Sequence, residues 1–102
     1  VKREIPASIV YEDSDLLAFK DINPIDKVHL LIIPKEHIEN LFYCKEQHKE
    51  TLSKMMFLAP KLAKENGLEG FRTMINTGAK GGQEVIHIHF NVYGGSEKLA
   101  KI

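Results

Sequence analysis

The chain has 102 residues, 43% of them hydrophobic, which is enough for one domain with a single modest core. Its 14 basic and 14 acidic side chains cancel, so the composition argues against a nucleic-acid surface or a polybasic membrane patch. A single cysteine excludes an internal disulfide, and no apolar run reaches the ~20 residues that span a bilayer. We expect one domain over residues 1–102, in a soluble cytoplasmic protein that binds neither nucleic acid nor membranes.

The first third of the chain has the pattern of three strands. Residues 9–11 and 16–20 are short apolar runs on either side of an acidic, turn-like stretch, so we predict a β-hairpin. Residues 28–33 are almost continuously apolar and stop at Pro34, which is typical of a central strand covered on both faces. Pro24 interrupts the stretch between the second and third strands, which we predict to be a loop.

A helical pattern follows, from Lys45 to Asn66. Apolar residues recur there at i, i+3, i+4 and i+7, and Gly67 is a typical C-terminal stop. Pro60 removes one main-chain hydrogen bond inside this helix, so we expect a kink at that point. The predicted buried positions are Leu52, Met55, Met56, Ala59, Leu62 and Ala63.

Two further strands complete the prediction, one at residues 71–76 and a long final one at residues 85–93. Because side chains alternate along a strand, His87, His89 and Asn91 should project from one face, at intervals of about 6.6 Å. The other face, which must be buried, carries Ile86, Ile88, Phe90 and Val92. The predicted fold class is α+β, a mostly antiparallel five-stranded sheet with one main helix and a short helix.

A glycine-rich loop, residues 77–83, lies shortly before the two histidines. The backbone N–H groups of Gly81, Gly82 and Gln83 can form a concave nest that binds an anion. Imidazoles on a rigid strand beside such a nest favour a site for a phosphate group.

Other interpretations of the same residues stay open at this point. His29, His87 and His89 together supply three nitrogens, as in catalytic zinc sites, although the glycine-rich loop favours an anion. They also fit ordinary half-buried or core histidines, and Asp21 fits a turn carboxylate that caps Asn23. Two further histidines, His37 and His48, are predicted to lie on the surface and are assigned no role.

Several separated blocks of the sequence closely resemble the histidine-triad (HIT) family, in its nucleotide-binding Hint branch. The blocks are residues 21–24, residues 29–38, Asn76, residues 81–83 and the His-Ile-His-Phe-Asn run of residues 87–91. They follow the family's order and spacing over nearly the whole chain. The resemblance implies a small α+β domain that forms a homodimer through its main helix and a β-strand, giving a continuous ten-stranded sheet. The cluster Met55, Met56 and Phe57 is expected to serve the core and this interface.

The resemblance also implies a role for each residue of the site. His89 corresponds to the nucleophile, which attacks the α-phosphorus of a nucleoside 5′-monophosphate derivative. His87 corresponds to the residue that supports and orients the nucleophile, and His29 supports the cluster from the neighbouring strand. The implied nucleotide-binding residues are Phe19 and Ile22 for the base, Asp21 for the ribose, and Asn76, Gly82, Gln83, Glu84 and Val85 for the phosphate.

The third triad position departs from the family, because Asn91 stands where a histidine is usual. An asparagine amide donates hydrogen bonds but does not titrate near neutral pH. The related galactose-1-phosphate uridylyltransferases carry glutamine there and are catalytic, so an amide is compatible with turnover.

The resemblance implies a purine nucleoside phosphoramidase without a metal or cofactor. It would cleave the P–N bond of AMP-amine or AMP-lysine adducts through a nucleotidyl-histidine intermediate. The alternative is a catalytically impaired module or scaffold that only binds AMP or GMP.

Overall fold

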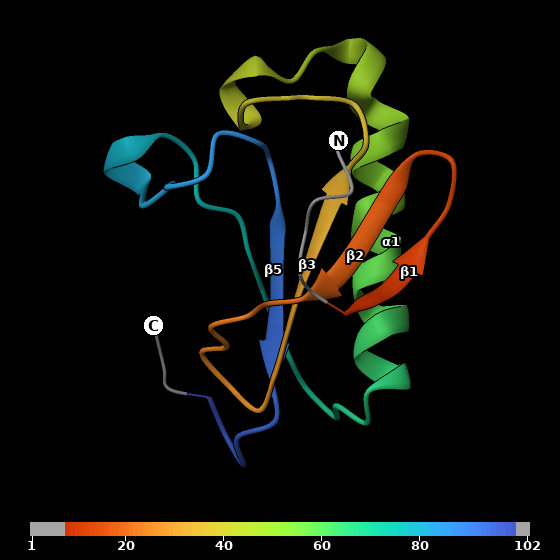
Figure 1. The fold of residues 1–102 in the computed structure, drawn as a ribbon, viewed down its shortest axis with the longest axis vertical. Helices are drawn as coiled ribbons and strands as arrows, with labels where there is room; N and C mark the ends of the chain where they lie inside the picture. Colours follow the sequence, from red (N-terminus) through yellow and green to blue (C-terminus); the bar gives the residue numbers. More distant parts are fainter. Residues whose placement is uncertain (1–7, 100–102) are drawn as a thin grey trace.

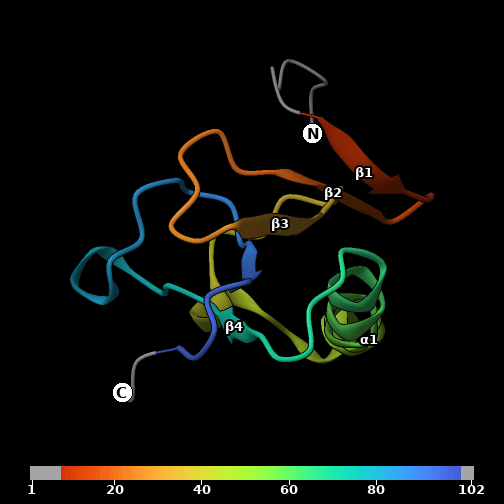
Figure 2. The same ribbon diagram turned by 90° about the horizontal axis from the view of Figure 1, so that it is seen from below.

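The computed structural model describes residues 8–99, which form a five-stranded antiparallel sheet with one long helix on one face (Figure 1). The strand order is β1-β2-β3-β5-β4, and a rotated view shows the helix α1 on a single side of the sheet (Figure 2). The predicted α+β class is therefore confirmed. The strands and the helix are β1 (Ile9–Glu12), β2 (Leu16–Lys20), β3 (Val28–Pro34), α1 (Lys49–Glu65), β4 (Arg72–Met74) and β5 (Phe90–Gly94).

The N-terminal hairpin and the central strand agree with the sequence predictions. β1 and β2 pair antiparallel, and the turn between them is held by Asp13, whose Oδ1 accepts the N–H groups of Asp15 and Leu16. β3 lies between β2 and β5 in the sheet. Leu30 and Ile32 on one face are 1% and 0% exposed, and Ile33 on the other face is 7% exposed, so both faces of the strand are covered.

The helix α1 starts four residues later than predicted, at Lys49, because a 3₁₀ turn over Glu46–His48 precedes it. It continues through Pro60 and ends at Glu65. Gly67 has φ +76°, and its N–H donates to the Lys64 carbonyl, as expected for a glycine that stops a helix. Within residues 8–99, no helix has the length and the apolar character needed to cross a lipid bilayer.

The buried stripe of α1 differs from the prediction at Met56. Met56 is 54% exposed and the neighbouring Phe57 is 77% exposed, whereas Leu58 is buried. At 3.6 residues per turn, a stripe that contains Met55 and Ala59 passes through Leu58 and leaves Met56 about 100° away from Met55. The stripe packs against the sheet residues Leu30, Ile32, Phe90 and Val92, and its members are Met55, Leu58, Ala59, Leu62 and Ala63.

The final strand is shorter than predicted. β5 begins at Phe90, so only Asn91 lies in it, and the prediction of one strand through His87, His89 and Asn91 is wrong. Its ladder with β3 ends at the pair Ile32–Phe90.

Two features of the preceding segment explain this early end. The Ile88 N–H donates to the Ile38 carbonyl at 2.7 Å, and the His87 N–H donates back to the Val85 carbonyl at 2.9 Å. Both donors are therefore committed outside the sheet. As a result Ile86, which was predicted to be buried, is 58% exposed. β4 is also shorter than the predicted strand, at three residues.

Candidate active site

The predicted site residues of the strands lie on the face of the sheet opposite α1. The register pairs Phe19 with Leu31, Leu31 with Asn91, and Asn91 with Met74. Directly opposite residues in an antiparallel sheet share a face, so these four side chains form one row across β2, β3, β5 and β4. Leu17, Phe19 and Ile33 form a small apolar cluster on this face, separate from the main core under α1.

The imidazole of His89 has a defined proton position. Its Nδ1 lies 2.9 Å from the His87 carbonyl oxygen, which only accepts hydrogen bonds, so Nδ1 carries the proton. In the neutral ring the lone pair is then on Nε2, which contacts no hydrogen-bonding partner among residues 8–99. His89 is half-buried. This geometry presents an unprotonated nitrogen that can act as a nucleophile.

The imidazole of His87 is engaged at both nitrogens. Nε2 donates to the Pro34 carbonyl at 2.8 Å, and Nδ1 lies 3.0 Å from Nδ1 of His37. Burial lowers the pKa of His87 below its ordinary value, and the nearby His37 and His89 rings lower it further. The Pro34 carbonyl opposes this shift by accepting the Nε2 proton. His87 is therefore neutral at pH 7 and supports His89 through its backbone carbonyl.

His29 and Asn91 form a second, separate pair. The Ile25 N–H donates to Nδ1 of His29 at 3.2 Å, so the neutral ring carries its proton on Nε2 and donates it to Asn91 Oδ1 at 3.0 Å. Asn91 Nδ2 donates in turn to the Met74 carbonyl at 3.2 Å. Each of the two side chains is only 6% exposed. The structure thus joins His29 to Asn91 and to neither of the other two histidines of the site.

Asp21 forms the turn considered for it and also approaches His29. Its Oδ1 accepts the N–H of Asn23 at 2.8 Å, as in an Asx turn, and its Oδ2 lies 3.6 Å from Nε2 of His29. The neighbouring base-pocket candidates differ in exposure: Phe19 is 9% exposed in β2, whereas Ile22 is 67% exposed in the following loop. Asp21 therefore lies between the buried His29–Asn91 pair and the exposed loop that contains Ile22.

The glycine-rich loop does not present the predicted nest. The N–H groups of Gly81, Gly82 and Gln83 donate to carbonyls of the loop itself, because residues 79–81 form a 3₁₀ turn that uses them. The nest prediction is wrong for these three donors. The next two residues differ: the N–H groups of Glu84 and Val85 donate to no protein acceptor within residues 8–99.

Two of the predicted phosphate-binding residues are neighbours in space. Gly82 has φ +88°, and a Cβ at this position would lie 3.7 Å from Cγ of Asn76. The left-handed backbone favours glycine at this position, whereas the Asn76 side chain would only be in ordinary contact with a Cβ. The structure therefore brings Asn76 against the turn that leads into Glu84.

The Gln83 side chain is buried and makes four hydrogen bonds. Its Nε2 donates to the carbonyls of Glu39 and Val85, and its Oε1 accepts from the Gly78 N–H and from Nδ2 of Asn40. With every polar atom committed, the side chain holds the loop in place and has no free group for a ligand. Because the backbone N–H of Gln83 also donates within the loop, to the Gly78 carbonyl, neither its side chain nor its backbone N–H is free for a phosphate.

Sequence reasoning missed two residues that support the site, His37 and Asn40. His37 was predicted to be a surface residue without a role, yet it contacts His87 across 50 positions of the chain. Asn40 bonds Gln83 across 43 positions. His37 lies within the block of residues 29–38 that resembles the family, but the sequence analysis gave it no role, and Asn40 lies outside every block. Contacts at this separation leave no periodic signal.

The residues of the zinc alternative do not gather around one point. In the part of the chain that the structure describes, no group of three or more His, Cys, Asp or Glu side chains is arranged to hold a metal ion. Both ring nitrogens of His29 bond elsewhere, to Ile25 and Asn91.

The chain is similar to proteins that carry a HIT domain. The HIT domain family model matches residues 2–98. Protein HitA of Neisseria gonorrhoeae is 50% identical over 93 residues, which cover 90% of this chain and 87% of that protein. The purine nucleoside phosphoramidase of Escherichia coli is 41% identical over 97 residues, which cover 93% and 82%.

Solved structures show the same similarity in three dimensions. A HIT family hydrolase from Clostridium thermocellum has a TM-score of 0.91 at 42% identity, and the alignment covers 98% of this chain and 89% of that one. The likeness therefore extends over the sheet, the helix and the loops that carry the histidines.

Proposed function

Because this chain belongs to the HIT-domain family, whose members include hydrolases, we propose that it is a purine nucleoside phosphoramidase. Its substrates would be nucleoside 5′-phosphoramidates of the AMP-amine or AMP-lysine type. The observation that carries the proposal is the fixed proton on Nδ1 of His89, which leaves the Nε2 lone pair for attack on phosphorus.

The proposed reaction has two displacements at phosphorus. His89 Nε2 attacks the α-phosphorus, the P–N bond breaks, and the amine leaves with a proton from solvent. As the imidazole becomes positively charged, its Nδ1–H bond to the His87 carbonyl strengthens and stabilises the nucleotidyl-histidine. Water then displaces His89 from phosphorus, which releases AMP and restores the neutral ring.

The phosphate oxygens are assigned to backbone donors after the glycine loop. The N–H groups of Glu84 and Val85 have no protein acceptor among residues 8–99, and they directly precede the histidine segment. Such donors stabilise the charge on phosphate without reorganisation during the reaction. The Asn76 side chain completes this part of the site. Gly82, whose N–H bonds the Ala79 carbonyl, contributes the left-handed turn beside Asn76, and Gln83 holds the loop.

The nucleoside is assigned to the β2 end of the site. Asp21 would bind the ribose hydroxyls through its carboxylate, and Phe19 and Ile22 would line the base. The high exposure of Ile22 supports this role, because an apolar side chain that is 67% exposed gains from burial against a purine.

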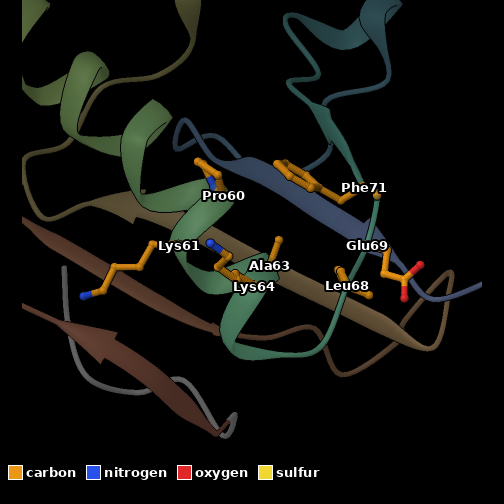
Figure 3. A pocket seen from close by; sticks show the side chains of 8 residues that line it. Pro60, Lys61, Ala63, Lys64, Leu68, Glu69 and Phe71 are labelled. Carbon is orange, nitrogen blue, oxygen red and sulfur yellow. The ribbon is translucent and has the colours of Figure 1, made fainter.

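We also propose that the protein acts as a homodimer. β4 is an edge strand, and a hollow of about 600 Å³ lies beside it, lined by Pro60 and Lys64 of α1 and by Phe71 (Figure 3). Met56 lies one helical turn before Pro60 on the same side of α1 and is 54% exposed. A second copy on this surface would cover Met56 and extend the sheet edge to edge into ten strands.

A second candidate function follows from Asn91. Its amide cannot supply a proton to the departing amine, and it is already bonded to His29 and Met74. If proton donation at this position is indispensable, the domain binds AMP or GMP without turnover. A missing general acid commonly costs about 10²–10⁴ in rate.

One assay separates the two functions. Purified protein is incubated with a fluorogenic adenosine 5′-phosphoramidate from pH 5 to 9, and amine release is followed beside the His89→Ala variant. We expect turnover in the wild type, none in His89→Ala, and AMP affinity by calorimetry within about tenfold in both. Wild-type AMP binding without turnover would instead identify a binding module.

A further inference from the structure

The last residue of β3 and the loop that follows it hold the segment that carries the proposed nucleophile. The Pro34 carbonyl accepts a proton from Nε2 of His87, and the Ile38 carbonyl accepts the Ile88 N–H. Between these two points His37 places its Nδ1 3.0 Å from Nδ1 of His87. The loop therefore contacts both the ring of His87 and the backbone next to it.

The proton between the two rings belongs to His37. Nε2 of His87 must be protonated, because its partner is a carbonyl oxygen. Nδ1 of the neutral His87 ring then holds a lone pair, and the close contact requires an N–H on Nδ1 of His37. The ring centroids lie 5.0 Å apart with planes tilted by 59°, a geometry in which a ring-edge N–H reaches the neighbouring ring-edge lone pair.

The His37–His87 contact is connected to the nucleophile through the backbone of His87. The carbonyl of His87 is the acceptor that fixes the proton on Nδ1 of His89. Without His37 the His87 ring would keep only its bond to the Pro34 carbonyl, and movement of residue 87 about this single anchor would turn its own carbonyl and release His89 to adopt either neutral tautomer. A ring with its proton on Nε2 has no lone pair there to attack phosphorus.

We propose that His37 is a positioning residue for the nucleophile: it is the second anchor of the His87 ring beside the Pro34 carbonyl, and it keeps residue 87 in place so that the His87 carbonyl holds His89 with a free Nε2. The inference rests on the proposed role of His89 as nucleophile. His37 touches neither His89 nor the reacting atoms in this arrangement, and it acts only through His87.

The test combines NMR of ¹⁵N-labelled imidazoles with steady-state kinetics on the fluorogenic adenosine 5′-phosphoramidate. The variants are His37→Ala, which removes the donor, and His37→Asn, whose amide N–H can occupy the place of Nδ1–H. Glu36→Gln is the matched control, because Glu36 belongs to the same loop but bonds His48 and not His87.

In the wild type we expect lone-pair ¹⁵N shifts at Nδ1 of His87 and at Nε2 of His89. In His37→Ala the Pro34 carbonyl should still keep the proton of His87 on Nε2, whereas the His89 ring should become a tautomer mixture. We expect kcat to fall about three- to tenfold, the scale of one net hydrogen bond. KM should stay within about twofold, since no substrate contact is lost. His37→Asn should recover most of both signals, and Glu36→Gln should keep them.

The proposal is overturned if His89 keeps one tautomer and kcat stays unchanged in His37→Ala. An equal fall in kcat in Glu36→Gln would also overturn it, because general loosening of the loop would then be the cause. If the wild type has no turnover, the proposed function fails separately. The His89 tautomer in His37→Ala then decides whether His37 positions that ring.

Discussion

At the scale of single residues, the site consists of two pairs that share no hydrogen bond. His89 depends on the backbone carbonyl of His87, and His29 depends on the amide of Asn91. The third triad position therefore acts in this chain as a link across β5, from His29 in β3 to Met74 in β4. A neutral imidazole, with one donor and one acceptor, could make the same two bonds as the amide.

This equivalence predicts the result of Asn91→His. The new ring can accept from His29 and donate to the Met74 carbonyl, so the fold should be retained. If the wild type is an enzyme, its kcat should change by less than about tenfold, and its pH profile should gain a limb near the histidine pKa. If the wild type is a binding module, activity should rise from background by more than about a hundredfold. Phosphoramidate turnover from pH 5 to 9 distinguishes these outcomes.

A second residue-scale prediction concerns His87 and the pH dependence of stability. Its pKa is lowered from 6.5 in the folded state, so the unfolded chain takes up this proton first as the pH falls. The free energy of unfolding should therefore decrease below pH ~6.5, until the pH passes the lowered pKa of the folded state.

The variant His87→Gln isolates this contribution, because its amide N–H can still donate to the Pro34 carbonyl but does not titrate. Urea unfolding at pH 7.5, 6.5, 5.5 and 5.0 should give a flatter decline for His87→Gln than for the wild type. Parallel declines in the two proteins would show that other groups account for the acid sensitivity.

At the scale of elements, the loops rather than the strands hold the histidine segment. Residues 34–40 bond His87, Ile88 and Gln83, so the loop after β3 replaces the missing part of the β5 ladder. Because His89 lies outside the strand, its side chain does not have to follow the alternating directions of strand side chains.

In these loops, Gln83 is the position where we expect a substitution to affect stability. Gln83→Ala would remove the partner of the Gly78 N–H, of Asn40 Nδ2 and of the Glu39 carbonyl, which are buried or partly buried, whereas the Val85 carbonyl would keep the His87 N–H. We expect a loss of about 2–3 kcal/mol in the free energy of unfolding, at the upper end for unsatisfied buried groups. The neighbouring exposed residue offers the control: Glu84→Ala should change stability by less than about 0.5 kcal/mol. Equal effects of the two variants in urea unfolding would contradict the bonding role of Gln83.

At the scale of the whole molecule, the two faces of the sheet have different roles. One face packs the main core against α1, and the opposite face carries the row that contains Phe19, Leu31 and Asn91. The edge at β4 and the neighbouring side of α1 lie outside both. The exposed apolar side chain of Met56 lies in this region, which we propose for the dimer.

The proposed dimer predicts the effect of a charge at that surface. Met56→Glu places a carboxylate in an interface that a second copy would cover, where an unpaired charge is costly. We expect sedimentation to show two chains for the wild type and one for Met56→Glu, with the same circular dichroism spectrum. Lys49→Glu, at the exposed start of α1, should leave the mass unchanged. A wild type that sediments as one chain at assay concentration would contradict the homodimer.

Sequence alone was sufficient where the signal is local or periodic. The hairpin, the central strand, the helix and its stop at Gly67 follow from apolar runs, turn residues and glycine geometry, which act over a few neighbouring positions. The block pattern around residues 87–91 also identified the family that the comparisons establish. These features depend on residue order, which the sequence contains in full.

Tertiary structure decided what depends on partners far along the chain. The alternation of residues 85–93 predicts a strand, but the Ile38 carbonyl takes the Ile88 N–H and ends the ladder at Phe90. The three expected nest donors bond within their own turn, and His37 gains a role only because folding brings it to His87. A backbone N–H has one hydrogen to donate. When it bonds a residue far along the chain, it is no longer available for the local structure that the sequence pattern predicts.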